Sequence, residues 1–343
     1  MKTFLQVHPE RSSKYGYLIG RVRVLERSLL NYRVLDSMLK AESLEQAIRA
    51  VQEVPYLGEK FQALSYKLED LNQALNEHHL WVVNEIASHK LGKDLAQFFV
   101  MQFNFLGLKL QLKAFLARKN LEKPPIGTLQ WSRILRFMSG ESGEFVPEPY
   151  RLAIQEAMAA YEEHSNIQAV ELVMDRFYLA ELLKLYSESS SRAIRNWYLA
   201  YVVLSLLQAA LRLRLQQRKL DLAMKIFLEN PFLKSSDFTI LITGSAEKVL
   251  EVFASLGLAF LLPEEGSYRE DPAFLADIER NIDNYLLQHL KPYRIVATGP
   301  EPILGFLFAK ALDIKNLRIV LQGKYFGLPE NVLRQKIREC YYE

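Results

Sequence analysis

Histidine and glutamate side chains lie close together along one stretch of the sequence, in an arrangement worth comparing with a zinc site. Glu85 and His89 are four residues apart, which places them on one face of a helix, and His78 and His79 come a few turns earlier. However, His78 and His79 point about 100° apart on a helix, and the sequence has no His-Glu-x-x-His cluster. We therefore interpret these residues as a partly exposed polar helix face and predict no metal site.

Acidic and glycine residues give no stronger indication of catalysis. Asp277, Glu279 and Asp283 are sparser than the magnesium-binding aspartates of helical prenyl-transfer enzymes, so capping and ion pairs between helical segments explain them better. Gly16 and Gly20 lie within a helical pattern, and the sequence has no Gly-x-x-x-x-Gly-Lys-Ser/Thr run. We predict no catalytic residue and no nucleotide or other cofactor.

Composition excludes several classes of protein. The 43 lysine and arginine residues are balanced by 40 acidic residues, so the net charge of +3 does not favour nucleic-acid binding. Cys340 is the only cysteine, which rules out a disulfide within the chain. The N-terminus lacks the apolar run of a signal peptide, and no apolar stretch reaches about 20 residues. Residues 197–211 are the most apolar, and we expect them to form a buried helix rather than a membrane span.

Helical periodicity is the dominant pattern among the elements that must position these residues. Apolar residues recur at three- and four-residue intervals from Tyr17 to Tyr32, and Ser43 begins a run with the form of a capping box. Gly107 is interpreted as a close-packing position. Because a lone strand would have no partner, residues 238–243 are interpreted as an extended or helical loop. Longer helices are predicted over residues 64–87, 94–119, 167–187 and 192–228. The sequence therefore predicts an all-α fold.

Three helix pairs along the chain resemble one another and indicate an internal repeat, whose members we call copies 1, 2 and 3. In each first helix a polar residue precedes an acid by four positions: Gln73 and Glu77, Glu171 and Asp175, Glu279 and Asp283. Each second helix is apolar, and Gly107, Leu206 and Asn316 occupy equivalent positions in it, 30, 31 and 33 residues after the acid. Three similar lobes about one axis would form a ring or funnel.

Motifs spread in order over nearly the whole chain carry a family resemblance. Residues 15–26 (YGYLIGRVRVLE) form an N-terminal signature, and residues 170–178 (VELVMDRFY) form an acidic helix that ends in aromatic residues. Residues 300–329 contain EPIL, Lys310, KNLRI, Gly-Lys and Gly-Leu-Pro in turn. Together these motifs resemble the C subunit of bacterial and archaeal V/A-type ATPases, a family whose eukaryotic V-ATPase members are known as the d subunit.

One family motif is only partly kept. The second helix of the family often carries Asp-x-x-Asn, which copy 3 retains as Asp313 and Asn316. Copy 1 has Asn104 and Gly107 at these positions, and copy 2 has two apolar residues, Val203 and Leu206. A polar network at this point of the helix is therefore in question for the first two copies, whereas the apolar pattern of the fold persists.

The resemblance implies a funnel-shaped assembly of three similar helical lobes with pseudo-threefold symmetry. We expect N-terminal helices over residues 1–67 and lobes over residues 68–166, 167–274 and 275–343. The implied function is that of a non-catalytic connector in the central rotor of a V/A-type rotary ATPase or ATP synthase. It would link the central shaft to the membrane proteolipid ring and transmit torque for proton or sodium transport.

The resemblance also implies partners and location. The chain would be a monomer within a hetero-complex, bound to the shaft subunits and the proteolipid ring on the cytoplasmic side of the membrane, without cofactor or nucleic acid. Two alternatives remain: a helical scaffold that binds another protein in a concave surface, and a helical enzyme. The enzyme would need a deep pocket with converging carboxylates or histidines.

Basic residues gather toward the C-terminal ends of the second helices in all three copies. The helix dipole favours cations there, which accounts for them without any partner. The same chemistry at corresponding ends also predicts a shared positive face that meets acidic partner surfaces. On this basis we predict six partner-interface residues: Lys109, Lys113, Arg212, Arg214, Arg318 and Lys324.

Other charged residues are predicted to have structural roles. Arg21 and Arg23 point about 160° apart on a helix, so at most one faces the apolar side, where it would need a carboxylate partner. The candidate partners are Glu171, Asp175, Glu279 and Asp283. Asp313 and Asn316 of the third copy complete the structural set.

Overall fold

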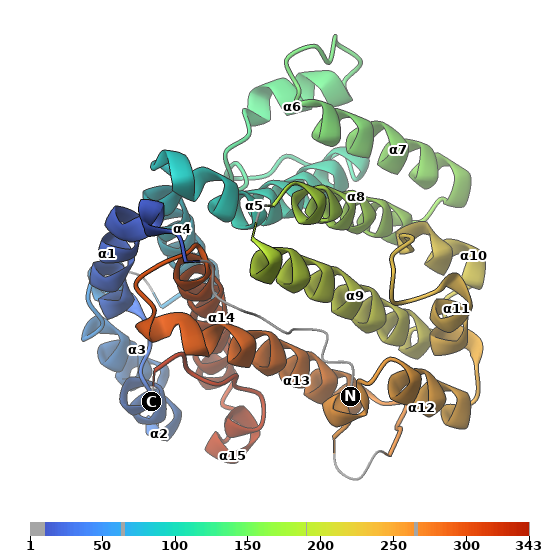
Figure 1. The fold of residues 1–343 in the computed structure, drawn as a ribbon. Coiled ribbons are helices and arrows are strands. Elements are labelled where there is room, and N and C mark those ends of the chain that lie inside the picture. The colour runs from blue at the N-terminus through green and yellow to red at the C-terminus, as the bar shows by residue number, and fades with distance from the viewer. Residues whose placement is uncertain (1–10, 63–65, 190, 264–266, 343) are drawn as a thin grey trace. The chain divides into compact units, whose positions relative to one another are not determined.

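A computed structural model describes residues 11–62, 66–189, 191–263 and 267–342, and its regular structure is helical (Figure 1). The α-helices are α1 Gly16–Leu25, α2 Tyr32–Lys40, α3 Leu44–Gln52, α4 Leu68–Ala87, α5 Lys90–Leu116, α6 Trp131–Met138, α7 Glu148–His164, α8 Ile167–Glu188, α9 Arg192–Leu215, α10 Leu220–Ala223, α11 Ser235–Thr243, α12 Ala246–Ser255, α13 Pro272–Leu290, α14 Glu301–Tyr325 and α15 Glu330–Arg334. Over the described residues, β pairing is limited to an isolated bridge between Asn31 and Tyr342. The predicted all-α fold is confirmed.

Polar side chains cap several helices at their first turns. The Ser43 hydroxyl accepts the Gln46 N–H at 3.3 Å, so the predicted start of α3 is confirmed. Asn31, Asn166 and Ser191 accept backbone N–H groups in the same way at the starts of α2, α8 and α9. Such a cap typically stabilises a protein by about 1 kcal/mol, because it satisfies an N–H that has no partner within the helix.

Two long helices end earlier than predicted, α5 at Leu116 and α9 at Leu215. Arg118 and Gln217 adopt left-handed backbone angles, with φ of 52° and 53°. In each case the next residue donates its N–H to the carbonyl five residues back, at 2.8 and 3.0 Å. This is the Schellman arrangement, which closes a helix and satisfies its last carbonyls.

The N-terminal apolar pattern belongs to two helices rather than one. The α1 helix ends at Leu25, a short 3-10 turn follows, and α2 begins at Tyr32. Tyr17 and Tyr32, which the periodicity placed on the apolar stripe, are 76% and 56% exposed. The stripe was therefore predicted too long at both ends.

Residues 238–243 form the body of α11, not an extended segment. Phe238, Leu241 and Ile242 are its buried residues, and their spacing is that of one helix face. Burial of this face overrides the strand preference of the β-branched residues, because propensity is weaker than tertiary packing.

The chain forms two compact units, divided within α5 and α13. Unit 1 contains Phe98–Ile278. Unit 2 contains the described residues up to Gln97 together with those from Glu279 onward. Each unit has its own helical core.

In unit 1, α8 packs between α7 and α9, and α11 packs on α9 (Figure 1). Aromatic rings join these helices to α5: the Phe98 ring centroid lies 5.3 Å from that of Trp197 and 4.8 Å from that of Tyr201. Gly107 of α5 lies against the indole of Trp131, where an added Cβ would overlap the ring. The prediction that Gly107 is a close-packing position is confirmed.

The α9 helix supplies the centre of unit 1. Of the described helices, α9 alone is long and apolar enough to cross a membrane by length and composition. Trp197, Leu204 and Leu207 are fully buried, and 61% of its most apolar window is buried within the structure. These contacts are those of a core helix, as the sequence predicts for residues 197–211.

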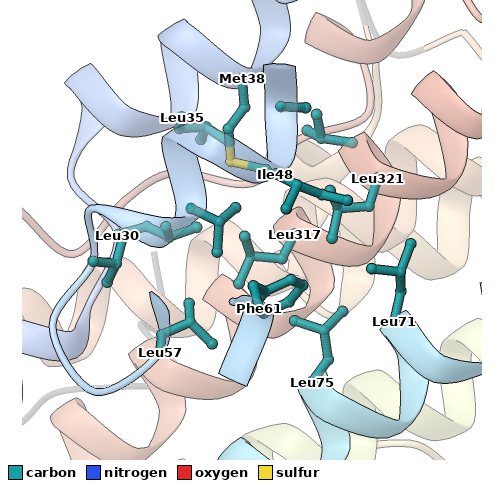
Figure 2. Packing of buried hydrophobic residues seen from close by; sticks show 14 of the residues in the cluster. Leu30, Leu35, Met38, Ile48, Leu57, Phe61, Leu71, Leu75, Leu317 and Leu321 are labelled. Carbon is teal, nitrogen blue, oxygen red and sulfur yellow. The ribbon is translucent and has the colours of Figure 1, made fainter. Parts of the chain in front are cut away.

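In unit 2, short N-terminal helices pack on α4 and α14. Figure 2 shows Leu35, Met38 and Ile48 of α2 and α3 together with Leu317 and Leu321 of α14. Leu71 and Leu75 of α4 face the same cluster, so α4 and α14 lie side by side. This cluster holds α14 in place, and α14 carries Lys310, Asp313 and Asn316, three of the buried polar residues described next.

Candidate functional site

Two charged side chains are buried in the middle of α14. Lys310 is 0% and Asp313 is 1% exposed. The Lys310 Nζ donates to the Ser28 carbonyl at 2.5 Å, and Asp313 Oδ2 accepts the Leu30 N–H at 2.8 Å. Because each charge satisfies a backbone group between α1 and α2, the pair ties the N-terminal segment to α14.

Burial acts on the protonation of this pair. It lowers the pKa of Lys310 and raises that of Asp313, because both charged forms lose their hydration. The opposite charge of each partner counteracts the shift in the other. Removal of one partner would therefore leave a charge that is expensive to bury.

Asn316 and Asp283 hold the C-terminal segment. The Asn316 amide accepts the Arg338 N–H at 2.7 Å and donates to the Arg338 carbonyl at 2.9 Å, much as a neighbouring strand would. Asp283 of α13 pairs with Lys315 at 2.8 Å and with the Arg338 Nε at 2.9 Å. These contacts support the structural roles predicted for Asp283, Asp313 and Asn316.

Copy 1 has a polar contact at the position of Asp313. Asn104 Oδ1 accepts the Thr128 N–H at 2.8 Å, and its Nδ2 donates to the Tyr150 hydroxyl at 2.9 Å. Like Asp313, Asn104 thus captures a backbone N–H from a connecting segment. Val203, the equivalent in copy 2, is buried and apolar. The polar contact is therefore kept in copy 1 with different partners and is lost in copy 2.

The predicted interface lysines of copy 1 form ion pairs within unit 1. Lys109 pairs with Asp175, and Lys113 pairs with Glu171. The two pairs lie one turn apart and join α5, the second helix of copy 1, to α8, the first helix of copy 2. The acids that mark the repeat in copy 2 thus bind basic residues of copy 1.

Arg318 makes a related contact within unit 2. Its Nη2 donates to Asn76 Oδ1 at 2.7 Å and its Nε to Asn72 Oδ1 at 3.1 Å, which joins α14 to α4. Burial lowers the pKa of the Arg318 guanidinium. Here too a second helix meets a first helix from another copy through a basic residue.

The other predicted interface cations have different surroundings. Arg214 pairs with Glu270 at 3.0 Å, and Lys324 donates to the Leu39 carbonyl at 2.7 Å near the end of α2. Arg212 is exposed on α9. Arg212 and Arg214 lie in unit 1, with the copy 1 lysines, and Lys324 lies in unit 2. The partner-interface assignment of all six residues therefore stays a prediction.

Arg21 and Arg23 lie on different faces of α1, as predicted. Arg21 pairs with Glu85. Arg23, the less exposed of the two, pairs with Glu26 at 2.6 Å and donates to the Val296 carbonyl at 2.9 Å. The carboxylate that meets Arg23 is therefore a near neighbour in sequence rather than one of the four acids proposed for it.

His78 and His79 are buried, contrary to the expectation of a partly exposed helix face. Burial lowers the pKa of His78 to about 2 and that of His79 to about 3, so both rings are neutral. Over the described parts of the chain, no group of three or more His, Cys, Asp or Glu side chains is arranged to hold a metal.

Sequence reasoning missed the importance of Lys310. A signal was available, since Lys310 stands alone among apolar residues from Ile303 to Leu312. A lysine surrounded on all helix faces by apolar residues is expected to be buried and paired.

Comparison with known proteins assigns the chain to a family. The family described as ATP synthase (C/AC39) subunit matches residues 18–336. The C subunit of the V-type sodium ATPase of Enterococcus hirae is 21% identical, over 96% of this chain and 99% of the relative. The C subunit of the A-type ATP synthase of Methanocaldococcus jannaschii is 22% identical, over 93% and 85%. The C subunit of the V-type ATP synthase of Deinococcus radiodurans is 21% identical, over 94% and 91%.

The family match covers most of the N-terminal signature, the acidic middle helix and the C-terminal motifs on which the resemblance rests. The resemblance predicted from the sequence is confirmed: this chain belongs to the C/AC39 subunit family of V/A-type ATP synthases.

Proposed function

We propose that this chain is a non-catalytic connector in the central rotor of a V/A-type rotary ATPase, where it links the central shaft to the proteolipid ring. The observation that carries the proposal is the family match over residues 18–336, since relatives that are C subunits of such complexes are covered nearly end to end. In this role the chain transmits torque and reacts with nothing.

The ends of the second helices support a three-lobed repeat. Arg118, Gln217 and Gly327 each lie 11 residues after the positions that the repeat makes equivalent. All three adopt left-handed backbone angles, with φ of 52°, 53° and 70°, and each is followed by the same bond to the carbonyl five residues back. Three lobes in a pseudo-threefold funnel, over residues 68–166, 167–274 and 275–343, remain our proposal on this basis.

A connector must resist deformation rather than lower a reaction barrier. The paired charges between α5 and α8 and the hydrogen bonds of Arg318 to α4 fix helices against sliding. Close packing between helices makes such units stiff. We propose that the six predicted basic residues act at the interface, in a peripheral subunit on the cytoplasmic side of the membrane.

Affinity purification from membranes tests the assignment. A tagged chain is expected to co-purify with shaft subunits and the proteolipid ring. Deletion of the chain is expected to separate ATP hydrolysis from ion pumping, and re-expression is expected to restore the coupling. Intact assembly and coupled pumping without the chain would overturn the proposal. A pull-down without any ATPase subunit would favour a general helical scaffold.

A further inference from the structure

Unit 2 contains a cavity of about 610 Å³ between α2, α13 and the C-terminal segment. Its walls are mostly apolar, and Leu35, Ile337, Cys340 and Tyr342 contribute to them. Tyr32, which is 56% exposed, also lines it. Pockets that bind small molecules have volumes of about 300–1,000 Å³, apolar walls and a few polar groups. The cavity therefore has the size and surface of a ligand site.

Basic side chains surround this apolar interior. Arg280, Lys291, Arg334 and Arg338 line the cavity, and Glu339 is the one acid among the described residues that line it. The basic residues come from α13, from the segment after it, from α15 and from the C-terminal segment. An anionic group is the complement of such a lining.

Ion pairs reduce this positive charge without cancelling it. Three lining cations pair with four carboxylates: Lys291 with Glu339, Arg334 with Asp36 and Glu330, and Arg338 with Asp283. Asp36 also binds Lys40, and Asp283 also binds Lys315. Among these groups, five cations therefore face four carboxylates. Arg280 also lines the cavity, and its Nη1 donates to the Gln335 carbonyl. This small excess suits a head group of low negative charge, whereas a polyphosphate carries more charge than the site can balance. The groups in the count are Lys40, Lys291, Lys315, Arg334 and Arg338 against Asp36, Asp283, Glu330 and Glu339.

We propose that this cavity binds an amphipathic anion, with a phosphate monoester or carboxylate head on the basic rim and a hydrocarbon or aromatic body against the apolar walls. Arg338 uses its Nε on Asp283 and its Nη1 on the Lys336 carbonyl. A guanidinium has five N–H groups, so Arg338 keeps donors for a ligand oxygen. The bound anion bridges α2, α13 and the C-terminal segment.

Octyl phosphate, used below its micellar concentration, is the probe. Calorimetry on the full chain is expected to show saturable binding, whereas octyltrimethylammonium and inorganic phosphate bind at least tenfold more weakly. Cys340 lines the cavity and is the only cysteine, so its modification by an uncharged maleimide reports the location. Octyl phosphate is expected to slow this modification.

Two variants separate the site from the general charge of the chain. Arg280→Met is expected to weaken octyl phosphate binding about tenfold, because a hydrogen bond to a charged group is lost. Arg33→Met removes an exposed charge beside Tyr32, outside the lining residues, and is expected to leave binding unchanged. Tyr32→Ala, at an exposed position, is expected to weaken binding without loss of the fold.

The outcomes are distinct. No saturable binding, equal binding of the cationic amphiphile, or binding that leaves Cys340 equally reactive would overturn the proposal. Equal effects of Arg280→Met and Arg33→Met would also overturn it. Sedimentation with vesicles that contain phosphatidic acid then identifies the source: co-sedimentation indicates a membrane lipid, and octyl phosphate binding without it indicates a soluble anion. Both results support an anionic amphiphile.

Discussion

Buried histidines make the stability of unit 2 depend on pH. Burial lowers the pKa of His78 to about 2 and that of His79 to about 3, whereas the unfolded chain binds these protons below about pH 6.5. Because the unfolded state takes up more protons, the free energy of unfolding is undiminished above pH 6.5 and falls as the pH decreases below it. Each histidine is expected to reduce stability by about 1.4 kcal/mol per pH unit in this range.

Denaturant unfolding of His78→Leu at pH 7.5 and pH 5 checks this linkage. Neither ring nitrogen of His78 has a hydrogen-bond partner among the described residues, so replacement at pH 7.5 is expected to be neutral or stabilising. At pH 5 the free energy of unfolding of the variant is expected to exceed that of the wild type by about 2 kcal/mol. An unchanged dependence on pH would contradict a neutral buried His78.

The Lys310–Asp313 pair is expected to behave as one unit. Lys310→Met leaves a buried carboxylate without its counter-charge and is expected to cost about 3–5 kcal/mol of unfolding free energy. Asp313→Asn in the same chain removes that charge and still offers an acceptor to the Leu30 N–H. The double variant is expected to be more stable, by at least about 2 kcal/mol of unfolding free energy, than the sum of the two single-variant costs would give. Strictly additive costs in denaturant unfolding would refute the coupling.

Some residue roles could be predicted from the sequence, and others could not. Gly107 was identified correctly because a glycine in a long helix needs a packing reason, and Trp131 supplies it. The carboxylate that pairs with Arg23 was not identified, although Glu26 lies three residues further on, a spacing at which side chains on a helix meet. The need for a carboxylate was predicted correctly, whereas the local partner was overlooked in favour of acids on other helices.

At the scale of elements, the three Schellman ends give a matched pair of glycines. Gly327 has φ of 70°, Gly20 lies within α1 with an ordinary helical backbone, and an added Cβ meets nothing within 4 Å at either position. Gly327→Ala is expected to destabilise the fold by about 1 kcal/mol, because only glycine avoids the left-handed strain. Gly20→Ala is expected to stabilise it by roughly 0.5–1 kcal/mol. Thermal or denaturant unfolding measures the stability change of both variants. A change of the same sign for Gly327→Ala and Gly20→Ala would contradict the assignment of the helix end.

The left-handed residue that follows each second helix also explains which helix boundaries were predictable. The end of α14 carries Gly327 and Pro329, two recognised stop signals. Arg118 and Gln217 adopt the same backbone angle without glycine, so the sequence gives no mark of the stops after α5 and α9. The predicted helices therefore overran by a few residues in copy 1 and by 13 in copy 2. The start of α3 was easier to predict, because the Ser43 cap acts locally.

At the scale of the whole molecule, the family could be inferred from the order of weak motifs along the chain. Residues 300–329 illustrate the reason: they contain the whole of α14, a helix buried over most of its length, where each substitution affects packing on several sides. Surface residues lack that constraint. The fold class was thus predictable, whereas an interface made of exposed cations had no comparable signal.

The interface hypothesis can be tested on α9, which has an exposed arginine at each end, Arg192 and Arg212. If the basic C-terminal ends meet acidic partner surfaces, Arg212→Ala should weaken binding to purified shaft subunits or proteolipid ring by about two- to fivefold at low salt. Arg192→Ala, at the opposite end of the same helix, should not. The difference in binding between the two variants should vanish at about 0.5 M salt, because charges are then screened within a few ångströms. Thermal unfolding of the isolated chain is the necessary companion measurement. An unchanged melting temperature with weaker binding places Arg212 at the interface, whereas a lower melting temperature or equal losses for both arginines would show that its charge serves the fold.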